Sequence, residues 1–161
     1  MTRDQNGTFF HELALSTSKA SYYPLALLCG RLSLTVAQSH FIFDAPDIDK
    51  RAALHICAER NGHSLAKALL KFGANPNLPD HHFSTPLHTA LRLGNDALAS
   101  LLLDFGADPR LLNRSGKSTR DFARTDEIKN RIDQSLASFE SIEISRFLGP
   151  AQSKKASDSR L

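Results

Sequence analysis

The chain has 161 residues, a length that suits one compact domain with its own hydrophobic core. Its 20 lysines and arginines exceed its 17 aspartates and glutamates only slightly. This excess is too small to indicate nucleic-acid binding by itself, and the ordinary apolar fraction of 41% predicts that most of the chain folds.

The N-terminal residues 1–8 are polar and lack the apolar core of a signal peptide. The longest apolar stretch, residues 25–29, is far too short to span a membrane. The two cysteines, Cys29 and Cys57, do not belong to a Cys-x-x-Cys pair, so we expect two buried thiols in a reducing compartment. These features predict a cytoplasmic protein that does not associate with membranes.

A repeat of 33 residues dominates the sequence, and it becomes visible when Asp47 is aligned with Asp80. No gap is needed over the length of the repeat. The matching pairs are Leu54-His55 with Leu87-His88, Leu69-Leu70 with Leu102-Leu103, Phe72-Gly73-Ala74 with Phe105-Gly106-Ala107, and Pro76 with Pro109. Such self-similarity is typical of units that cannot bury their apolar face alone and therefore stack.

Residues 1–46 are predicted to form a degenerate N-terminal repeat with an insertion. Residues 4–14 resemble a repeat start, but His11 lies 44 residues before His55, which is more than one repeat. Pro24 opens a second helix in this interpretation, and Gly30 ends or kinks it.

Residues 47–79 and 80–112 form the two clearest repeats, each with two helices and a loop. In the second of them, Thr85 precedes the first helix and Pro86 lies in its first turn, where its missing N–H costs nothing. Gly94, like Asn61 one repeat earlier, tolerates the left-handed backbone that ends this helix. A second helix follows over residues 96–104 and ends before Gly106. Its predicted apolar stripe consists of Leu98, Leu101, Leu102 and Phe105.

Residues 113–149 are predicted to contain a degenerate last repeat and a capping helix. Arg120 occupies the position that Leu87 has in the preceding repeat, and we expect it to be exposed because no further repeat covers it. From Asp126 onward, apolar residues follow at spacings of four and three, which indicates an amphipathic helix that stops at Gly149-Pro150. We interpret this helix as a cap over the open end of the stack, with a partner-binding helix as the alternative.

Residues 150–161 are small, polar and charged, and are predicted to be a disordered tail. The final Ser159-Arg160-Leu161 is similar to the Ser-Lys-Leu address of peroxisomal proteins, so a peroxisomal location is the alternative in a eukaryotic host. The same three residues fit a ligand of a PDZ-type domain, and a chance match is the third interpretation.

These motifs resemble the ankyrin-repeat family. Its hallmarks are a Thr-Pro-Leu-His start, present at residues 85–88, a glycine between two antiparallel helices, and a Leu-Leu-x-x-Gly-Ala-Asp ending, present at residues 102–108. The resemblance implies an all-α solenoid of stacked helix-turn-helix units with a C-terminal capping helix. It also implies that His55 and His88 bond backbone groups of neighbouring loops.

In ankyrin arrays, the loop tips and the outer side of each first helix line a groove that binds partner proteins. Phe83 stands where the repeat normally has glycine, so it is either an exposed aromatic anchor or packs against the adjacent loop. The predicted partner-binding residues are Ile48, Asp49, Arg51, Glu59, Arg60, His81, His82, Phe83, Ser84, Arg92, Leu93, Arg114, Ser115 and Lys117.

No catalytic motif is present, so we expect no enzyme activity, no cofactor and no catalytic residue. Residues 116–118 echo the end of a phosphate-binding loop, but the upstream glycine is replaced by Leu111. The pair His81-His82 lacks a second pair of ligands, so no metal site is expected. Acidic residues interrupt any basic stripe, which argues against nucleic acid.

The sequence thus predicts a monomeric, non-catalytic scaffold or adaptor that binds an unidentified partner protein. The alternative is a regulatory or targeting part of a larger enzyme complex, or a bacterial effector, with the chemistry located elsewhere.

Overall fold

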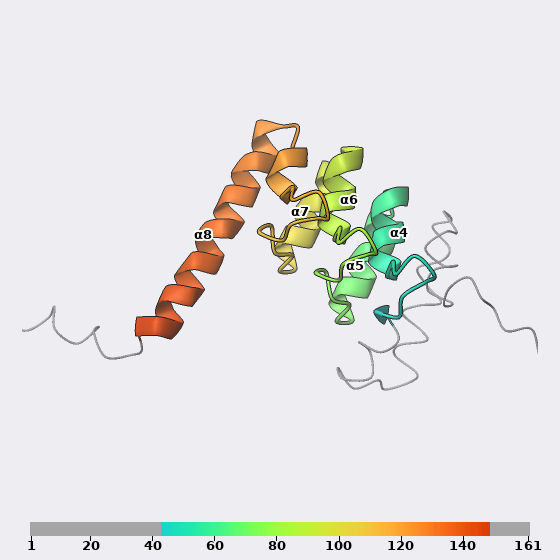
Figure 1. The fold of residues 1–161 in the computed structure, drawn as a ribbon, viewed down its shortest axis with the longest axis horizontal. Coiled ribbons are helices and arrows are strands. Elements are labelled where there is room, and N and C mark those ends of the chain that lie inside the picture. Colours follow the sequence, from blue (N-terminus) through green and yellow to red (C-terminus); the bar gives the residue numbers. More distant parts are fainter. Residues whose placement is uncertain (1–42, 149–161) are drawn as a thin grey trace, which may run out of the picture.

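A computed structural model describes residues 43–148 of the chain (Figure 1). This part is helical and contains no strand between residues 43 and 148, which confirms the predicted all-α class. The elements are α4 (Ala53–Arg60), α5 (His63–Lys71), α6 (Pro86–Leu93), α7 (Asp96–Asp104), the 3-10 helix η2 (Thr119–Phe122) and α8 (Asp126–Leu148).

The helices form two layers because each repeat contributes one helix to each layer. In the first layer α6 packs between α4 and η2, and in the second α7 packs between α5 and α8 (Figure 1). Within each repeat α4 contacts α5 and α6 contacts α7, so the units are helix-turn-helix pairs stacked side by side.

The ends of the first helices lie where the sequence predicts them. Thr85 is the extended N-cap of α6, with Pro86 as the first helical residue, and Gly94 ends the helix with a left-handed φ of 77°. In the preceding repeat Asn61 takes the same left-handed conformation, with φ 54°. Asparagine is one of the few non-glycine residues that adopt this conformation readily, which explains how it replaces glycine here.

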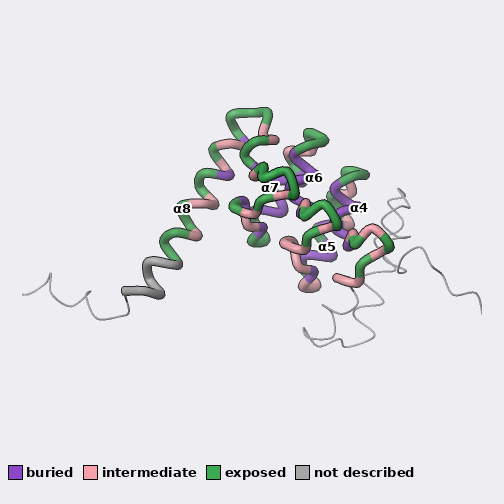
Figure 2. The backbone as a smooth tube through the Cα atoms, viewed as in Figure 1, coloured by how far each residue is buried: buried purple, intermediate pink, exposed green. Residues whose placement is uncertain are grey.

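The core lies between the two layers and is built from the matched leucines of successive repeats (Figure 2). Small residues, Cys57 and Ala90, are fully buried where α4 and α6 pack together. Burial raises the pKa of the Cys57 thiol to about 12, so this free thiol stays protonated and unreactive. Six leucines of the two clearest repeats are all in the core: Leu54, Leu69, Leu70, Leu87, Leu101 and Leu102.

The predicted apolar stripe of α7 is correct for its leucines and wrong for Phe105. Leu98, Leu101 and Leu102 are buried, whereas Phe105 is the C-cap of the helix and its exposed fraction is 37%. The helix ends at this point, so the helical spacing no longer directs the Phe105 side chain into the core.

Helix α8 has 23 residues, so it is about 35 Å long, whereas α5 and α7 have 9 residues each. Ile128 and Ile132 near its start are buried, but Ile142 is 58% exposed. The helix therefore covers the end of the stack with its first turns and then extends past it (Figure 1). It ends at Leu148, directly before Gly149-Pro150, as predicted.

Predictions for the two ends of the chain lie outside the described residues. They concern the repeat start at residues 4–14, the helix at Pro24, Cys29, and the tail with its final Ser159-Arg160-Leu161. Among the helices between residues 43 and 148, none combines the length and the apolar character needed to cross a membrane.

Candidate functional site

Three successive loops, residues 47–51, 80–84 and 113–117, have the same construction and are called the loop tips below. In each, the Oδ1 atom of the first residue accepts hydrogen bonds from the backbone N–H groups of the third and fifth residues. The first and fifth residues also pair through their backbones at 2.9–3.0 Å. The first residues are Asp47, Asp80 and Asn113, so the polar side chain that folds each loop is read directly from the 33-residue repeat.

The fourth residue of each loop tip has a left-handed backbone. The φ values are 57° at Lys50, 58° at Phe83 and 71° at Gly116. Glycine adopts this conformation freely, whereas a residue with a Cβ atom is strained there by about 1–2 kcal/mol. Phe83 nevertheless keeps a bulky side chain that is 58% exposed, which is the arrangement that the anchor interpretation requires.

Buried histidines connect each repeat to the next loop tip. Nδ1 of His55 accepts the backbone N–H of Ala52 at 3.1 Å, so the proton lies on Nε2, which donates to the carbonyl oxygen of Ser84 at 2.9 Å. His88 repeats the pattern with Thr85 and with the carbonyl oxygen of Lys117 at 3.3 Å. Burial lowers the pKa of both imidazoles, so both stay neutral. They bond neighbouring loops, as the resemblance implies.

A surface depression of about 420 Å³ lies between the loop tips and the first helices α4 and α6. Seven predicted partner-binding residues line it, together with three that sequence analysis did not propose. The predicted ones are Asp49, Arg51, Glu59, His81, His82, Ser84 and Arg92, and the additional ones are His55, Asp80 and Thr89. Asp80 could have been noticed because it lies 33 residues after Asp47, at the same position of the repeat. This spacing, however, predicts a residue that closes a turn and does not show that the residue lines a binding surface.

Arg51 is less available for binding a partner than the sequence suggested. Its guanidinium lies 2.9 Å from the carboxylate of Asp47, 3.5 Å from that of Asp49 and 3.2 Å from that of Glu59. Arg51 therefore acts first as a structural ion-pair partner that holds its loop tip against α4. Arg92, the equivalent of Glu59 one repeat later, is exposed and has no ion pair with any residue between 43 and 148.

The imidazoles of His81 and His82 are in contact, with their ring centres 3.7 Å apart and their planes tilted by 44°. Nδ1 of His81 is 2.9 Å from the carbonyl oxygen of Asp49, and His81 is one of the residues that line the depression. No group of three or more potential metal ligands was found among the described residues. Two imidazoles alone do not complete the four-ligand set that zinc prefers.

The other predicted residues lie on the surface around this depression. The side chains of Ile48, Phe83 and Leu93 are 74%, 58% and 43% exposed. Four further exposed residues complete the predicted set: Arg60 on α4, and Arg114, Ser115 and Lys117 in the third loop tip. The ammonium group of Lys117 lies 5.8 Å from the ring centre of Phe122, a cation–π contact.

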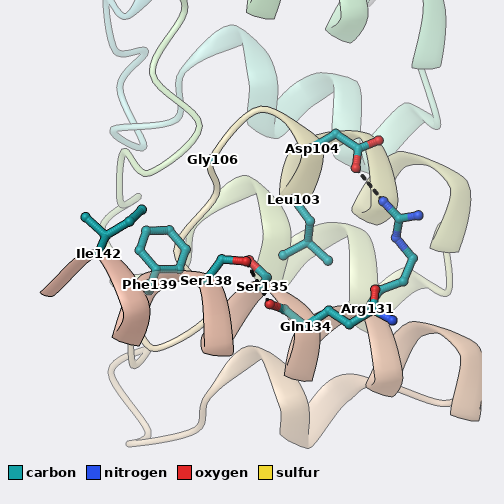
Figure 3. A pocket seen from close by; sticks show the side chains of 9 residues that line it. All are labelled: Leu103, Asp104, Gly106, Arg131, Gln134, Ser135, Ser138, Phe139 and Ile142. Atoms are coloured by element: carbon teal, nitrogen blue, oxygen red, sulfur yellow. Dashed lines mark hydrogen bonds and ion pairs between the residues drawn. The ribbon is translucent and has the colours of Figure 1, made fainter. Parts of the chain in front are cut away.

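A second depression of about 430 Å³, which sequence analysis did not predict, opens where α8 separates from the end of α7 (Figure 3). Leu103 points from α7 toward α8, and Phe139 and Ile142 of α8 line its other side (Figure 3). Arg131 of α8 forms an ion pair with Asp104 of α7 at its edge. The guanidinium of Arg110 lies over the ring of Phe139, 5.0 Å from its centre.

Comparison with known proteins agrees with this architecture. A family model described as "Ankyrin repeats (3 copies)" matches residues 25–113, more than half of the chain. The chain belongs to the ankyrin-repeat family. Repeats of this family generally serve as protein–protein interaction modules.

Among solved structures, the chain is similar to the crystal structure of the ankyrin repeat domain of Bcl-3, which is described as a unique member of the IkappaB protein family. The sequence identity is 25% and the TM-score 0.65, over 80% of this chain and 52% of that chain. The chain thus spans about half of the length of that domain. No curated protein matches the sequence.

Proposed function

We propose that this protein is a non-catalytic scaffold or adaptor that binds a partner protein through the face formed by the loop tips and the first helices α4 and α6. The observation that carries the proposal is the depression between these elements, which brings together side chains from two repeats. Seven of the fourteen residues expected from the repeat pattern line it.

The contacts of the buried histidines and the variation among the exposed residues favour a binding function over a catalytic one. The histidines that could act as acids or bases, His55 and His88, have both ring nitrogens engaged with backbone groups. The exposed side chains between the repeats vary in chemistry, with Glu59 and Arg92 at equivalent positions. A stack needs constant residues at its contacts and tolerates any residue on its surface, so variation is where partner specificity can reside.

The test is a pair of double variants with equal changes of charge. Arg60→Glu with Arg92→Glu changes the last turns of α4 and α6, beside the depression. Lys67→Glu with Lys71→Glu changes exposed residues of α5, on the opposite layer. Partners are isolated with the intact chain, identified, purified, and titrated against both variants by calorimetry.

We expect the first variant to weaken binding roughly tenfold or more, because interface arginines often contribute strongly. The second should bind as the intact chain does. Equal affinity of both variants, with unchanged melting temperatures, would place the interface away from this face, with α8 as the next region to test.

A further inference from the structure

We propose that the end of the binding face nearest α8 binds an acidic segment of the partner protein, whose aspartate or glutamate side chains pair with Arg92, Arg114 and Lys117. These three residues are called the basic cluster below. The inference rests on the proposed function and adds the chemistry of the partner. Three observations carry it: an ion pair that only the first of the described repeats makes, the contacts that connect the cluster, and the charges around it.

The first observation is an ion pair that the later repeats lack. In the first described repeat, the guanidinium of Arg51 pairs with the carboxylate of Glu59 at 3.2 Å. The equivalent pairs of the next two repeats are Ser84 with Arg92, and Lys117 with Thr125. Each of these repeats therefore keeps one cation and has no carboxylate at the partner position. Arg92 and Lys117 are exposed, and neither has an ion pair with any residue between 43 and 148. Carboxylates of a partner would supply the missing half of both pairs.

The second observation is a series of contacts that connects the members of the basic cluster. The backbone N–H of Arg114 donates to the carbonyl oxygen of His82 at 2.8 Å, so the third loop tip lies against the second. Nε2 of His88 donates to the carbonyl oxygen of Lys117 at 3.3 Å, and Arg92 follows His88 by four residues on the same side of α6. The cluster thus occupies one stretch of surface, and it adjoins the depression that His82 and Arg92 line.

Arg124 adds positive charge beside the basic cluster. Its Nη2 atom donates to the carbonyl oxygen of Arg92 at 2.8 Å, a position that the negative end of α6 favours for a cation. The carboxylate of Asp96 accepts the hydroxyl of Thr125 at 2.9 Å and forms no ion pair with either arginine. The end of α6 therefore carries two guanidinium groups that no carboxylate of the described residues pairs with.

The third observation is the balance of charge around the cluster. Residues 113–124 contain four cations and a single carboxylate, that of Asp121. This carboxylate accepts the backbone N–H and the hydroxyl of Ser118, at 2.7 and 3.0 Å. Of the four cations, only Arg120 has a carboxylate partner between residues 43 and 148, namely Asp133 of α8. The unpaired charge on this surface is therefore positive, and its electrostatic complement is acidic.

The third loop tip favours a row of carboxylates over a single phosphate group. Loops that hold a phosphate do so largely through free backbone N–H groups. Here the N–H groups of Ser115 and Lys117 donate to Oδ1 of Asn113, and that of Gly116 donates to the carbonyl oxygen of Asn113. The loop thus offers side-chain cations from separate positions, which suit separate carboxylates along a peptide.

The neighbouring depression argues against a nucleic-acid strand. A strand that followed the basic cluster toward the first described repeat would meet three carboxylates that line the depression, those of Asp49, Glu59 and Asp80. A continuous row of phosphates is repelled there, whereas a peptide can change from acidic to neutral or basic residues at this point.

The experiment selects short random peptides for binding to the full chain by display. Selected peptides are labelled with a fluorophore and titrated against the intact chain and two double variants. Arg92→Glu with Lys117→Glu reverses two charges of the basic cluster. Lys67→Glu with Lys71→Glu makes the same change of charge on exposed residues of α5, in the opposite layer. A phosphoserine peptide and a single-stranded oligonucleotide of similar length are titrated in parallel.

We expect the selected peptides to be enriched in aspartate and glutamate. The first double variant should bind them roughly tenfold or more weakly, and the α5 variant should bind them as the intact chain does. Replacing the acidic residues of a peptide by their amides should weaken binding, and so should added salt. The milder Arg92→Gln with Lys117→Gln should lose less, and the melting temperatures of all variants should stay within a few degrees of that of the intact chain.

Selected peptides without an acidic excess, but with weaker binding to the first double variant, would overturn the acidic chemistry and leave the proposed function in place. Acidic peptides that bind both double variants equally would overturn the basic cluster as their site. The inference would also be wrong if no peptide were selected, or if the oligonucleotide or the phosphoserine peptide bound more tightly than the acidic peptides.

Discussion

His55 donates a hydrogen bond from Nε2 to the carbonyl oxygen of Ser84, 29 residues later in the chain and 2.9 Å away. His88 makes the equivalent bond to Lys117, also 29 residues later. Each bond joins a first helix to the loop tip of the next repeat. Because the other ring nitrogen accepts a backbone N–H, a second proton on the imidazole would face a donor, and the bonding scheme exists only for the neutral ring.

The first prediction concerns pH. Burial lowers the pKa of His55 and His88 below the ordinary value of 6.5, so the unfolded chain binds protons at these positions before the folded chain does. The stability from these groups is complete above about pH 6.5 and decreases as the pH falls from there toward the lowered pKa values. Urea titrations between pH 7.5 and pH 5 should show this decrease. The same titration of His55→Gln should have a shallower slope than that of the intact chain.

The second prediction concerns Leu87, which is fully buried in α6, the helix that packs against α4, α7 and η2. Leu87→Ala leaves a cavity among four elements and should reduce the free energy of unfolding by about 2–5 kcal/mol. Leu112→Ala is the matched control, because Leu112 is 57% exposed, and it should change stability by less than about 0.5 kcal/mol. Chemical denaturation of both variants decides the point, and similar losses from both would contradict the described core.

The third prediction concerns the side chain that closes the second loop tip. Oδ1 of Asp80 accepts the N–H groups of His82 and Ser84, both at 2.8 Å. Asp80→Ala removes both bonds and should cost about 1 kcal/mol or more, since a net hydrogen bond contributes about that much. Asp80→Asn should cost clearly less, because Asn113 closes the next loop tip through the same two bonds with an amide oxygen. If asparagine were as damaging as alanine, the charge rather than the hydrogen bonds would be the essential feature.

The fourth prediction separates the two parts of α8. Ile132 is fully buried at the end of the stack, and Ile132→Ala should destabilise the protein by about 2–5 kcal/mol. Ile142 is 58% exposed beyond the stack, and Ile142→Ala should change stability by less than about 0.5 kcal/mol. Thermal or urea unfolding of the two variants tests whether only the first turns of the helix serve as the cap. A large loss from Ile142→Ala would show that the cap extends along the helix.

Much of the fold follows from local rules that act within one repeat. Thr85, Pro86 and Gly94 determine where α6 begins and ends, and Gly149-Pro150 predicts the end of α8, because each acts through its own backbone. The buried leucines follow from the helical spacing in the same way. Phe105 was misplaced since this spacing applies only as far as the helix continues.

The candidate site was less predictable because it depends on which side chains meet. Nothing in the spacing of Asp47, Arg51 and Glu59 shows that one guanidinium serves both carboxylates and leaves the surface less charged than the composition suggests. The exposure of Phe83 could not be decided from the sequence either, since a left-handed phenylalanine can turn toward or away from its neighbour. The depression beside α8 arises from the angle at which α8 leaves the stack, which the sequence of α8 alone does not fix.

The cross-repeat bonds described above span 29 to 32 residues, and each of them joins one repeat only to the next. Because the contact between one repeat and the next always has the same form, an additional repeat can be inserted into the stack. A duplicated 33-residue segment placed between residues 112 and 113 would bring its own turn-closing aspartate, its own histidine and its own stripe of leucines, and would find a matching surface on both sides. The edge of the stack would become one loop longer without any change to the loops already there. The length of the surface offered to a partner can therefore change by one repeat at a time.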